Sequence, residues 1–80
     1  VIATGFEYGS GEQSNLVGAV TLAEYGPDGK LRDAGKCGTG FDLVTRKAAL
    51  TWKYPLVIKI EADKREPTGK FRFPVFKNLH

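Results

Sequence analysis

The residues best suited to bind a ligand lie in a glycine-rich segment, residues 35–41, with the sequence GKCGTGF. Its three glycines let the backbone pass close to a partner and expose amide N–H groups, which suit a phosphate. Lys36 adds a positive charge, Thr39 a hydroxyl group, and Phe41 an apolar wedge or plug. The pattern fits equally well a tight turn between a strand and a helix, in which Phe41 packs inside the protein.

Basic and aromatic residues alternate in a second segment, residues 70–77, with the sequence KFRFPVFK. Such interleaving holds nucleic acid by stacking bases on rings and by pairing cations with phosphates. The same alternation fits a strand whose phenylalanines face the core and whose basic residues face water. On that interpretation, Arg72 and Lys77 are the two side chains of the segment that merit a test.

Catalytic and metal-binding patterns are missing from the sequence. No glycine-rich stretch ends in the Lys-Ser/Thr of a P-loop. Cys37 and His80 are too few for a zinc site, which needs three or four ligands, and a terminal histidine is usually frayed and a poor base for a cysteine. We therefore expect no catalytic residue and no metal ligand here, and the chain alone is not expected to be an enzyme. A single cysteine excludes an internal disulfide and fits a reducing compartment.

Length and composition predict one small globular domain. The 80 residues are 41% hydrophobic and 26% charged, which is too apolar for a disordered chain. No apolar run approaches the roughly 20 residues that span a bilayer, so we expect no membrane partner. The first residues lack the basic region and cleavage site of a signal peptide, and the start at Val1 in place of Met predicts a domain cut from a longer protein.

The formal net charge of +3 is divided unevenly along the chain. Residues 1–29 contain four acidic and no basic residues, whereas residues 30–80 contain all twelve basic and five acidic residues. Such a division predicts a basic side that faces an anionic partner. The alternative is an ordinary solvated surface, with charges that are distributed unevenly along the chain by chance.

Five strands and one helix are predicted from the hydrophobic pattern. Apolar, β-branched and aromatic runs predict strands at residues 1–8, 16–25 and 30–37, the last two joined by a GPDG turn. Asp42 can cap a helix over residues 42–52, in which Leu43, Arg46, Lys47 and Leu50 fall at helical spacing. Residues 56–63 alternate between an apolar and a polar face, and a last strand contains Phe71, Phe73 and Val75, with Pro74 at an edge or a strand end.

This order predicts an all-β protein, a small five-stranded OB-fold barrel with one short helix between strands 3 and 4. A small SH3-like barrel is the main structural alternative. It usually has no helix at that point, so the pattern favours the oligonucleotide-binding barrel.

Three segments resemble the C-terminal OB domain of ATP-dependent DNA ligases. Residues 30–41, KLRDAGKCGTGF, resemble the hairpin and turn of that domain; residues 69–79, GKFRFPVFKNL, look like the start of ligase motif VI; and residues 54–61, YPLVIKIE, are similar to the strand before it. The segments occur in the family's order over nearly the whole chain. The resemblance implies that residues 1–80 are a single OB-fold domain of a longer, cytoplasmic ligase of bacterial, phage or archaeal type.

The resemblance also implies a mechanism. In this family a separate nucleotidyltransferase domain carries the lysine that takes AMP from ATP, with Mg²⁺, and the OB domain closes over it. The OB domain later meets the minor groove of duplex DNA opposite a nick, during DNA replication, repair and recombination. ATP and Mg²⁺ therefore belong to the parent enzyme, and this chain alone binds neither. The implied DNA-binding residues are Lys36, Thr39, Phe41, Arg46 and Lys47, and the implied pyrophosphate-orienting residues are Arg72 and Lys77.

The sequence departs from the family in three places. The family continues with an Arg-x-Asp-Lys ending, whereas this chain has His80 where the Arg is expected, and the stretch between Phe41 and Tyr54 is short. The loop at residues 9–15 lacks basic residues, and Glu12 would repel phosphate, so we assign no DNA contact to it. Two other functions stay open: a stand-alone single-strand-binding OB module, which normally displays exposed aromatic rings, and the OB lid of an RNA-capping guanylyltransferase.

Overall fold

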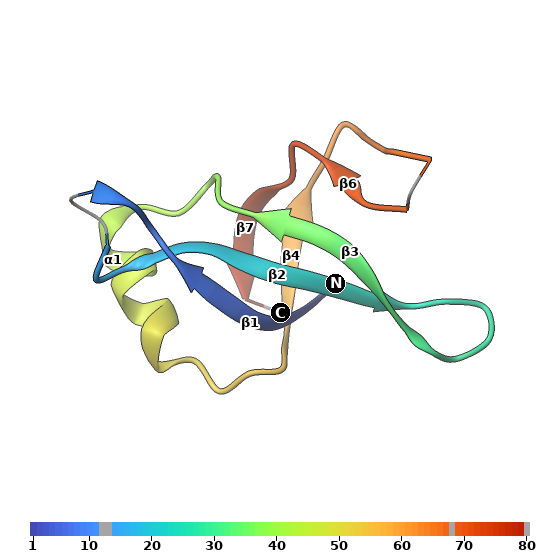
Figure 1. Ribbon diagram of the computed structural model, residues 1–80, viewed down its shortest axis with the longest axis horizontal. Coiled ribbons are helices and arrows are strands. Elements are labelled where there is room, and N and C mark those ends of the chain that lie inside the picture. Colours follow the sequence, from blue (N-terminus) through green and yellow to red (C-terminus); the bar gives the residue numbers. More distant parts are fainter. Residues whose placement is uncertain (12–13, 68, 80) are drawn as a thin grey trace.

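The fold is built on a five-stranded antiparallel sheet with the strand order β3-β2-β1-β4-β7 (Figure 1). The computed structural model describes residues 1–11, 14–67 and 69–79. The sheet strands are β1 (Ile2–Tyr8), β2 (Val17–Tyr25), β3 (Leu31–Cys37), β4 (Leu56–Glu61) and β7 (Val75–Leu79). The helix lies between the third and fourth strands of this sheet. The prediction of a mostly β protein with one short helix at that point is confirmed.

The predicted hairpin is formed by β2 and β3, which pair from Val20–Cys37 to Tyr25–Leu31. At its turn, the Gly29 N–H donates to the Gly26 carbonyl at 3.0 Å, and Gly29 itself has a φ of 78°. Such a left-handed conformation is one that glycine adopts without steric cost. The hairpin end extends beyond the rest of the molecule (Figure 1).

The sheet is not closed into a barrel within the described residues, which corrects the prediction of a small five-stranded barrel. Its two edge strands are β3 and β7. The chain that leaves β3 meets β7 in one isolated parallel bridge, Thr39–Val75, where the Phe76 N–H donates to the Thr39 carbonyl at 2.8 Å. The two edges are thus joined at one point and not along a ladder.

A separate two-stranded ribbon explains why the edges stay apart. It consists of β5 (Lys64–Arg65) and β6 (Phe71–Arg72), and we call it the β5–β6 ribbon. It lies against β3 at Gly35, whose φ is 100° and where a Cβ would come 3.4 Å from the Lys70 Cβ. The ribbon therefore occupies part of the edge of β3 along which β7 would have to pair to close a barrel.

The single last strand predicted from the alternating pattern is wrong, because the chain breaks between β6 and β7. Phe73 sits at the break with a φ of 50°, and its side chain is exposed while that of Pro74 is buried. The reversal at Phe73 ends the alternation that the sequence pattern implied.

The core lies between the sheet and an aromatic cluster contributed by the segments before and after the helix. The Phe41 ring stacks on the Phe76 ring with a centroid separation of 4.6 Å, and Trp52 lies 5.7 Å from Phe76. On β4, Ile58 is fully buried while Lys59 is exposed, which confirms the alternation predicted there. The buried apolar residues are Ala3, Val17, Val20, Leu22, Ala23, Ala34, Cys37, Phe41, Ala49, Ile58 and Phe76.

The helical segment is α1 (Leu43–Ala48), continued by the short 3₁₀ turn η2 (Ala49–Thr51). The predicted cap is present, because the Thr45 N–H donates to Asp42 Oδ1 at 2.7 Å. The helix does not pack as its apolar spacing suggested. No residue of α1 is buried, and the side chain of Leu43 is 66% exposed. Six residues give too short an apolar face, and hydrogen bonds from Arg46 hold the helix instead.

Candidate nucleic-acid interface

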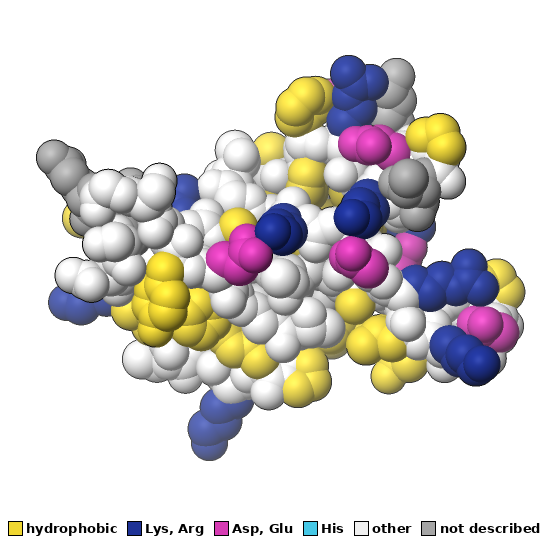
Figure 2. Space-filling model, in the orientation of Figure 1, with side chains coloured by type: hydrophobic (Ala, Val, Ile, Leu, Met, Phe, Trp, Pro, Cys, Tyr) yellow, Lys and Arg dark blue, Asp and Glu magenta, His cyan; other side chains and the backbone are white. Residues whose placement is uncertain are grey.

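The outward side of β1, β2 and β3 is a surface of small side chains, which we call the front face. Thr21 pairs with Gly5 on β1 and with Lys36 on β3. Because Val20 and Leu22 point into the core, Ala19 and Thr21 point to the other side of the sheet. Figure 2 looks onto this face, and Figure 1 shows the strands in the same orientation. A surface of this kind permits close approach of an extended backbone.

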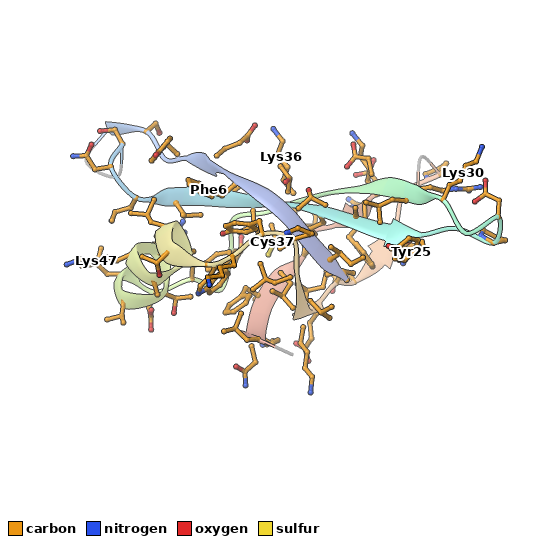
Figure 3. All side chains as sticks on the ribbon, turned by 90° about the horizontal axis from the view of Figure 1, so that it is seen from below. Phe6, Tyr25, Lys30, Lys36, Cys37 and Lys47 are labelled. Atoms are coloured by element: carbon orange, nitrogen blue, oxygen red, sulfur yellow. The ribbon has the colours of Figure 1, made fainter. Side chains whose placement is uncertain are left out.

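Lys36 projects from the front face, as Figure 3 shows, but its charge is already partnered. Its Nζ lies 2.8 Å from Oε1 of Glu7 on β1, and both side chains are more than half exposed. An exposed ion pair contributes little to stability, about 0–1 kcal/mol. A phosphate can therefore compete with Glu7 for Lys36 at small cost.

Acidic and basic residues that lie far apart in the sequence meet in space. Among the described residues, Glu7 pairs with Lys36 and Glu24 pairs with Arg65, across 29 and 41 positions of sequence. Asp28 pairs with Arg32, which lies only four positions further along the chain. Figure 2 accordingly shows acidic and basic side chains next to one another on this face. On this face the fold therefore interleaves the acidic first part of the chain with the basic remainder, and the prediction of a basic side that faces an anionic partner stays a prediction.

The glycine-rich turn after β3 is exposed at residues 38–40, and it also has a packing role. The Thr39 carbonyl accepts the Phe76 N–H, and Gly40 has a φ of 91°. A Cβ on Gly40 would lie 2.4 Å from the Phe76 carbonyl oxygen, closer than any real contact. The close approach to β7 thus requires this glycine, while the Thr39 side chain remains available to a partner.

Phe41 is a core residue and not a candidate for direct contact with DNA. Its side chain is 8% exposed and stacks on Phe76. Of the two interpretations of the glycine-rich segment, the one in which Phe41 packs inside the protein therefore holds for this residue. Its neighbour in the core, Cys37, is fully buried. Burial raises the pKa of the Cys37 thiol above its usual value, which leaves the thiol protonated and unreactive at neutral pH.

Arg46 acts within the protein. One guanidinium nitrogen donates to the carbonyls of Val17 and Gly18 at 2.8 and 2.9 Å, and the other donates to that of Gly38 at 2.8 Å. These bonds hold α1 against β2 and against the turn after β3. The next residue, Lys47, is exposed and points away from the helix into solvent (Figure 3).

The two residues predicted to orient pyrophosphate lie on different elements. Arg72 is exposed on β6, and its guanidinium carbon is 5.3 Å from the centroid of the Phe73 ring. Lys77 is exposed on β7 and lies 3.2 Å from a carboxylate oxygen of Glu61. Lys36 and Lys47 lie on two further elements, β3 and α1, and Figure 3 shows these two lysines pointing in different directions. The structure therefore does not gather the predicted residues into one site.

Two functional features were not predicted from the sequence. The Glu7–Lys36 pair depends on the register of β1 on β2, which no local signal specifies. The exposure of Phe73 depends on the break before Pro74, and the proline itself was the available signal. Phe73 borders an open groove of about 830 Å³ beside β4, which Phe71 and Lys59 also line.

No protein-family model and no curated protein matches this chain. Within residues 1–11, 14–67 and 69–79, no three His, Cys, Asp or Glu side chains come together as a metal site would require. None of the helices described here has the length and apolar character to cross a membrane.

Proposed function

We propose that this chain is the OB domain of an ATP-dependent DNA ligase and that it binds duplex DNA around a nick without reading the base sequence. The main support for this proposal is the front face, on which Lys36 is surrounded by the small residues Gly5, Ala19 and Thr21. A cation on a surface of small side chains suits the sugar–phosphate backbone. Phosphate contacts supply affinity and fix orientation but carry no sequence information.

The topology supports the OB assignment within this proposal. The OB-fold is a five-stranded, partly open Greek-key barrel that binds oligonucleotides on strands 2 and 3 and on the loops beside them. This chain has a five-stranded sheet, a helix between the third and fourth strands, and one bridge between Thr39 and Val75 that joins the sheet edges. The front face includes the corresponding strands β2 and β3.

Duplex binding is favoured over a stand-alone single-strand binder by the chemistry of the front face. Single-strand binders rely on exposed aromatic rings along which successive bases stack. The described residues at the centre of the front face include no aromatic ring. The three sequence segments that resemble ligases then favour a ligase over the other uses of the fold.

In the proposed parent enzyme, ATP and Mg²⁺ act in the separate nucleotidyltransferase domain. Thr39 and Lys47 join Lys36 as candidate DNA contacts, because all three are exposed. Arg46 contributes indirectly, by holding the turn that presents Thr39. Arg72 and Lys77 remain candidates for contact with the nucleotidyltransferase domain during adenylation.

Fluorescence anisotropy of the 80-residue chain with nicked and intact duplexes tests this proposal. Lys36→Ala should lower the affinity for both duplexes without changing any sequence preference, and should reduce the slope of log K against log salt by about one unit. Glu7→Gln should raise the affinity, because it removes the carboxylate that competes with phosphate for Lys36.

Lys77→Ala serves as the matched control, because it removes another exposed, ion-paired lysine from outside the front face. It should leave duplex affinity close to that of the parent chain. If Lys36→Ala and Glu7→Gln both bind like the parent chain, the front face is not the DNA-binding surface.

A further inference from the structure

Phe73 occupies the corner between β6 and β7 in a backbone conformation that is unfavourable for its side chain. Its φ is 50°, a region that glycine and asparagine enter at low cost but that is an outlier for a bulky residue. Residues held in such conformations cluster at functional sites, where the surrounding structure enforces them. The sequence nevertheless places a phenylalanine at this corner.

Core packing does not account for the ring. The Phe73 side chain is 71% exposed, although Phe71 before it is half-buried and Pro74 after it is buried. Of these three side chains, only that of Phe73 therefore points outward. Covering an exposed aromatic ring with the flat face of a partner removes apolar surface from water and is favourable.

The corner is fixed relative to the sheet by the β5–β6 ribbon. Arg65 of the ribbon forms an ion pair with Glu24 on β2, and its guanidinium carbon lies 4.3 Å from the centroid of the Phe71 ring. A second ion pair joins Lys70 to Asp33 on β3. The bidentate Arg65–Glu24 pair attaches the ribbon to β2, and the more exposed Lys70–Asp33 pair adds little to this attachment. Phe73 follows directly after the attached ribbon and is thus presented in a preorganised position.

Positive charge accompanies the ring. The Arg72 guanidinium lies over the Phe73 ring, its carbon 5.3 Å from the ring centroid, and Lys59 lines the same groove. Neither Arg72 nor Lys59 forms an ion pair within the described part of the chain. The groove also contains Asp63, which would repel a phosphate, and Glu61, whose charge is met by Lys77. The cations beside Phe73 are thus the ones available to an anionic ligand.

We propose that Phe73 stacks on an unpaired nucleobase of a nucleic-acid strand while Arg72 and Lys59 bind the neighbouring phosphates. An aromatic face next to a guanidinium matches a base joined to a phosphate, and stacking accepts every base because each has a π-face. This inference rests on the proposed function in that its ligand is nucleic acid. It adds a second contact, to a single-stranded end, away from the front face.

The test compares two labelled single strands of equal length and charge, oligo-dT and an abasic strand, by fluorescence anisotropy with the 80-residue chain. The parent chain should bind oligo-dT about tenfold more tightly than the abasic strand. Phe73→Asn should abolish this preference and leave the thermal midpoint unchanged or higher, because asparagine tolerates the positive φ. Phe73→Trp should retain the preference, and Arg72→Ala should weaken binding of both strands alike.

Tyr8→Asn is the control, since Tyr8 is a comparably exposed aromatic residue on β1 outside the groove, and it should leave the preference intact. A parent chain that binds duplex but does not distinguish oligo-dT from the abasic strand would overturn the stacking inference and spare the proposed function. A chain that binds neither strands nor duplex at low salt would overturn both. A midpoint several degrees lower in Phe73→Asn would show instead that the ring is needed for packing.

Discussion

At the scale of single residues, the role of a basic side chain is decided by the groups that the fold places within its reach. Arg46 and Lys47 are adjacent in sequence, and both were predicted to contact DNA. The fold leaves the carbonyls of Val17, Gly18 and Gly38 where the Arg46 guanidinium bonds to all three. A planar guanidinium with several donors can satisfy such a set, whereas a lysine ammonium cannot match its geometry.

The contrast between these neighbours gives a stability prediction. Arg46→Ala should lower the free energy of unfolding by about 2 kcal/mol, because it removes three charge-assisted hydrogen bonds and the packing of the side chain over Phe41. Lys47→Ala, one position along, should change the free energy by no more than about 0.5 kcal/mol. Urea unfolding followed by Trp52 fluorescence measures both. Equal effects of the two substitutions would contradict the structural role of Arg46.

At the scale of elements, short-range signals decide where α1 begins. The Asp42 carboxylate accepts the Thr45 N–H, and this hydrogen bond holds the pKa of Asp42 below its usual value. A carboxyl group whose pKa is lowered by folding stabilises the fold above its unfolded pKa and loses that effect as pH falls through the folded pKa. The helix start is therefore sensitive to acid.

Substitution of the cap should show this dependence. Asp42→Ala should lower the thermal midpoint by a few degrees at pH 7, because an N-cap hydrogen bond is lost. The difference from the parent chain should shrink as pH falls below about 4, the ordinary pKa of an unfolded aspartate, because the unfolded chain then binds a proton that the folded carboxylate still resists. The difference is lost once the pH falls through the lowered pKa of folded Asp42. Asp42→Asn should keep most of the stability at pH 7, since asparagine also caps helices. Differential scanning calorimetry from pH 3 to pH 7 measures the series, and a difference that does not vary with pH would contradict it.

The contact between the turn after β3 and the start of β7 is a second local feature that determines how the elements are placed. Gly40 and Gly29 both have positive φ values, but the space around them differs. A Cβ on Gly29 would meet nothing within 4 Å, whereas a Cβ on Gly40 would collide with the Phe76 backbone. The difference separates the cost of the backbone conformation from the cost of the close approach.

Two alanine substitutions measure these costs. Gly29→Ala should destabilise by about 1–2 kcal/mol, the cost of a left-handed conformation. Gly40→Ala should cost about 3 kcal/mol or more, because β7 must also move. Chemical denaturation of the two variants provides the comparison. If they lose the same free energy, the bridge between Thr39 and Val75 contributes nothing to stability.

At the scale of the whole molecule, the fold mixes charges that the sequence keeps apart. Among the side chains that the structure describes, five basic ones form ion pairs: Arg32, Lys36, Arg65, Lys70 and Lys77. Local pairing weakens the long-range field that would otherwise draw the chain toward DNA. The net charge of +3 is therefore available to a partner at a few separate sites and not over one broad basic surface.

The salt dependence of duplex binding should reflect this arrangement. Each phosphate contact contributes about −0.9 to the slope of log K against log salt. We expect a slope no steeper than about −3, corresponding to roughly three contacts. Anisotropy titrations between about 50 and 200 mM salt give the value. A slope near −8 would mean that most basic residues contact phosphate at once, which the distribution of charges does not allow.

The features that the sequence predicted are those with short-range causes. The Asp42 cap, the turn at residues 26–29 and the alternation along β4 each depend on residues close together in the chain. The β5–β6 ribbon, the Glu7–Lys36 pair and the carbonyls around Arg46 depend on how distant strands are placed, and local patterns do not encode this. The prediction of a barrel was wrong for the same reason, because the number of strands does not determine whether the edges of a sheet meet.

The way β1 joins β4 has a consequence for the dynamics of the sheet. Within the described chain, these strands pair only at Ile2–Val57 and Ala3–Leu56, whereas β1 pairs with β2 along most of its length. Amide hydrogen exchange should therefore resolve two units, β1–β2–β3 and β4–β7, that open independently at this short seam. Amides at the seam should exchange faster than those at the centre of the hairpin. Opening at the seam would separate β1 from β4 without unfolding either unit.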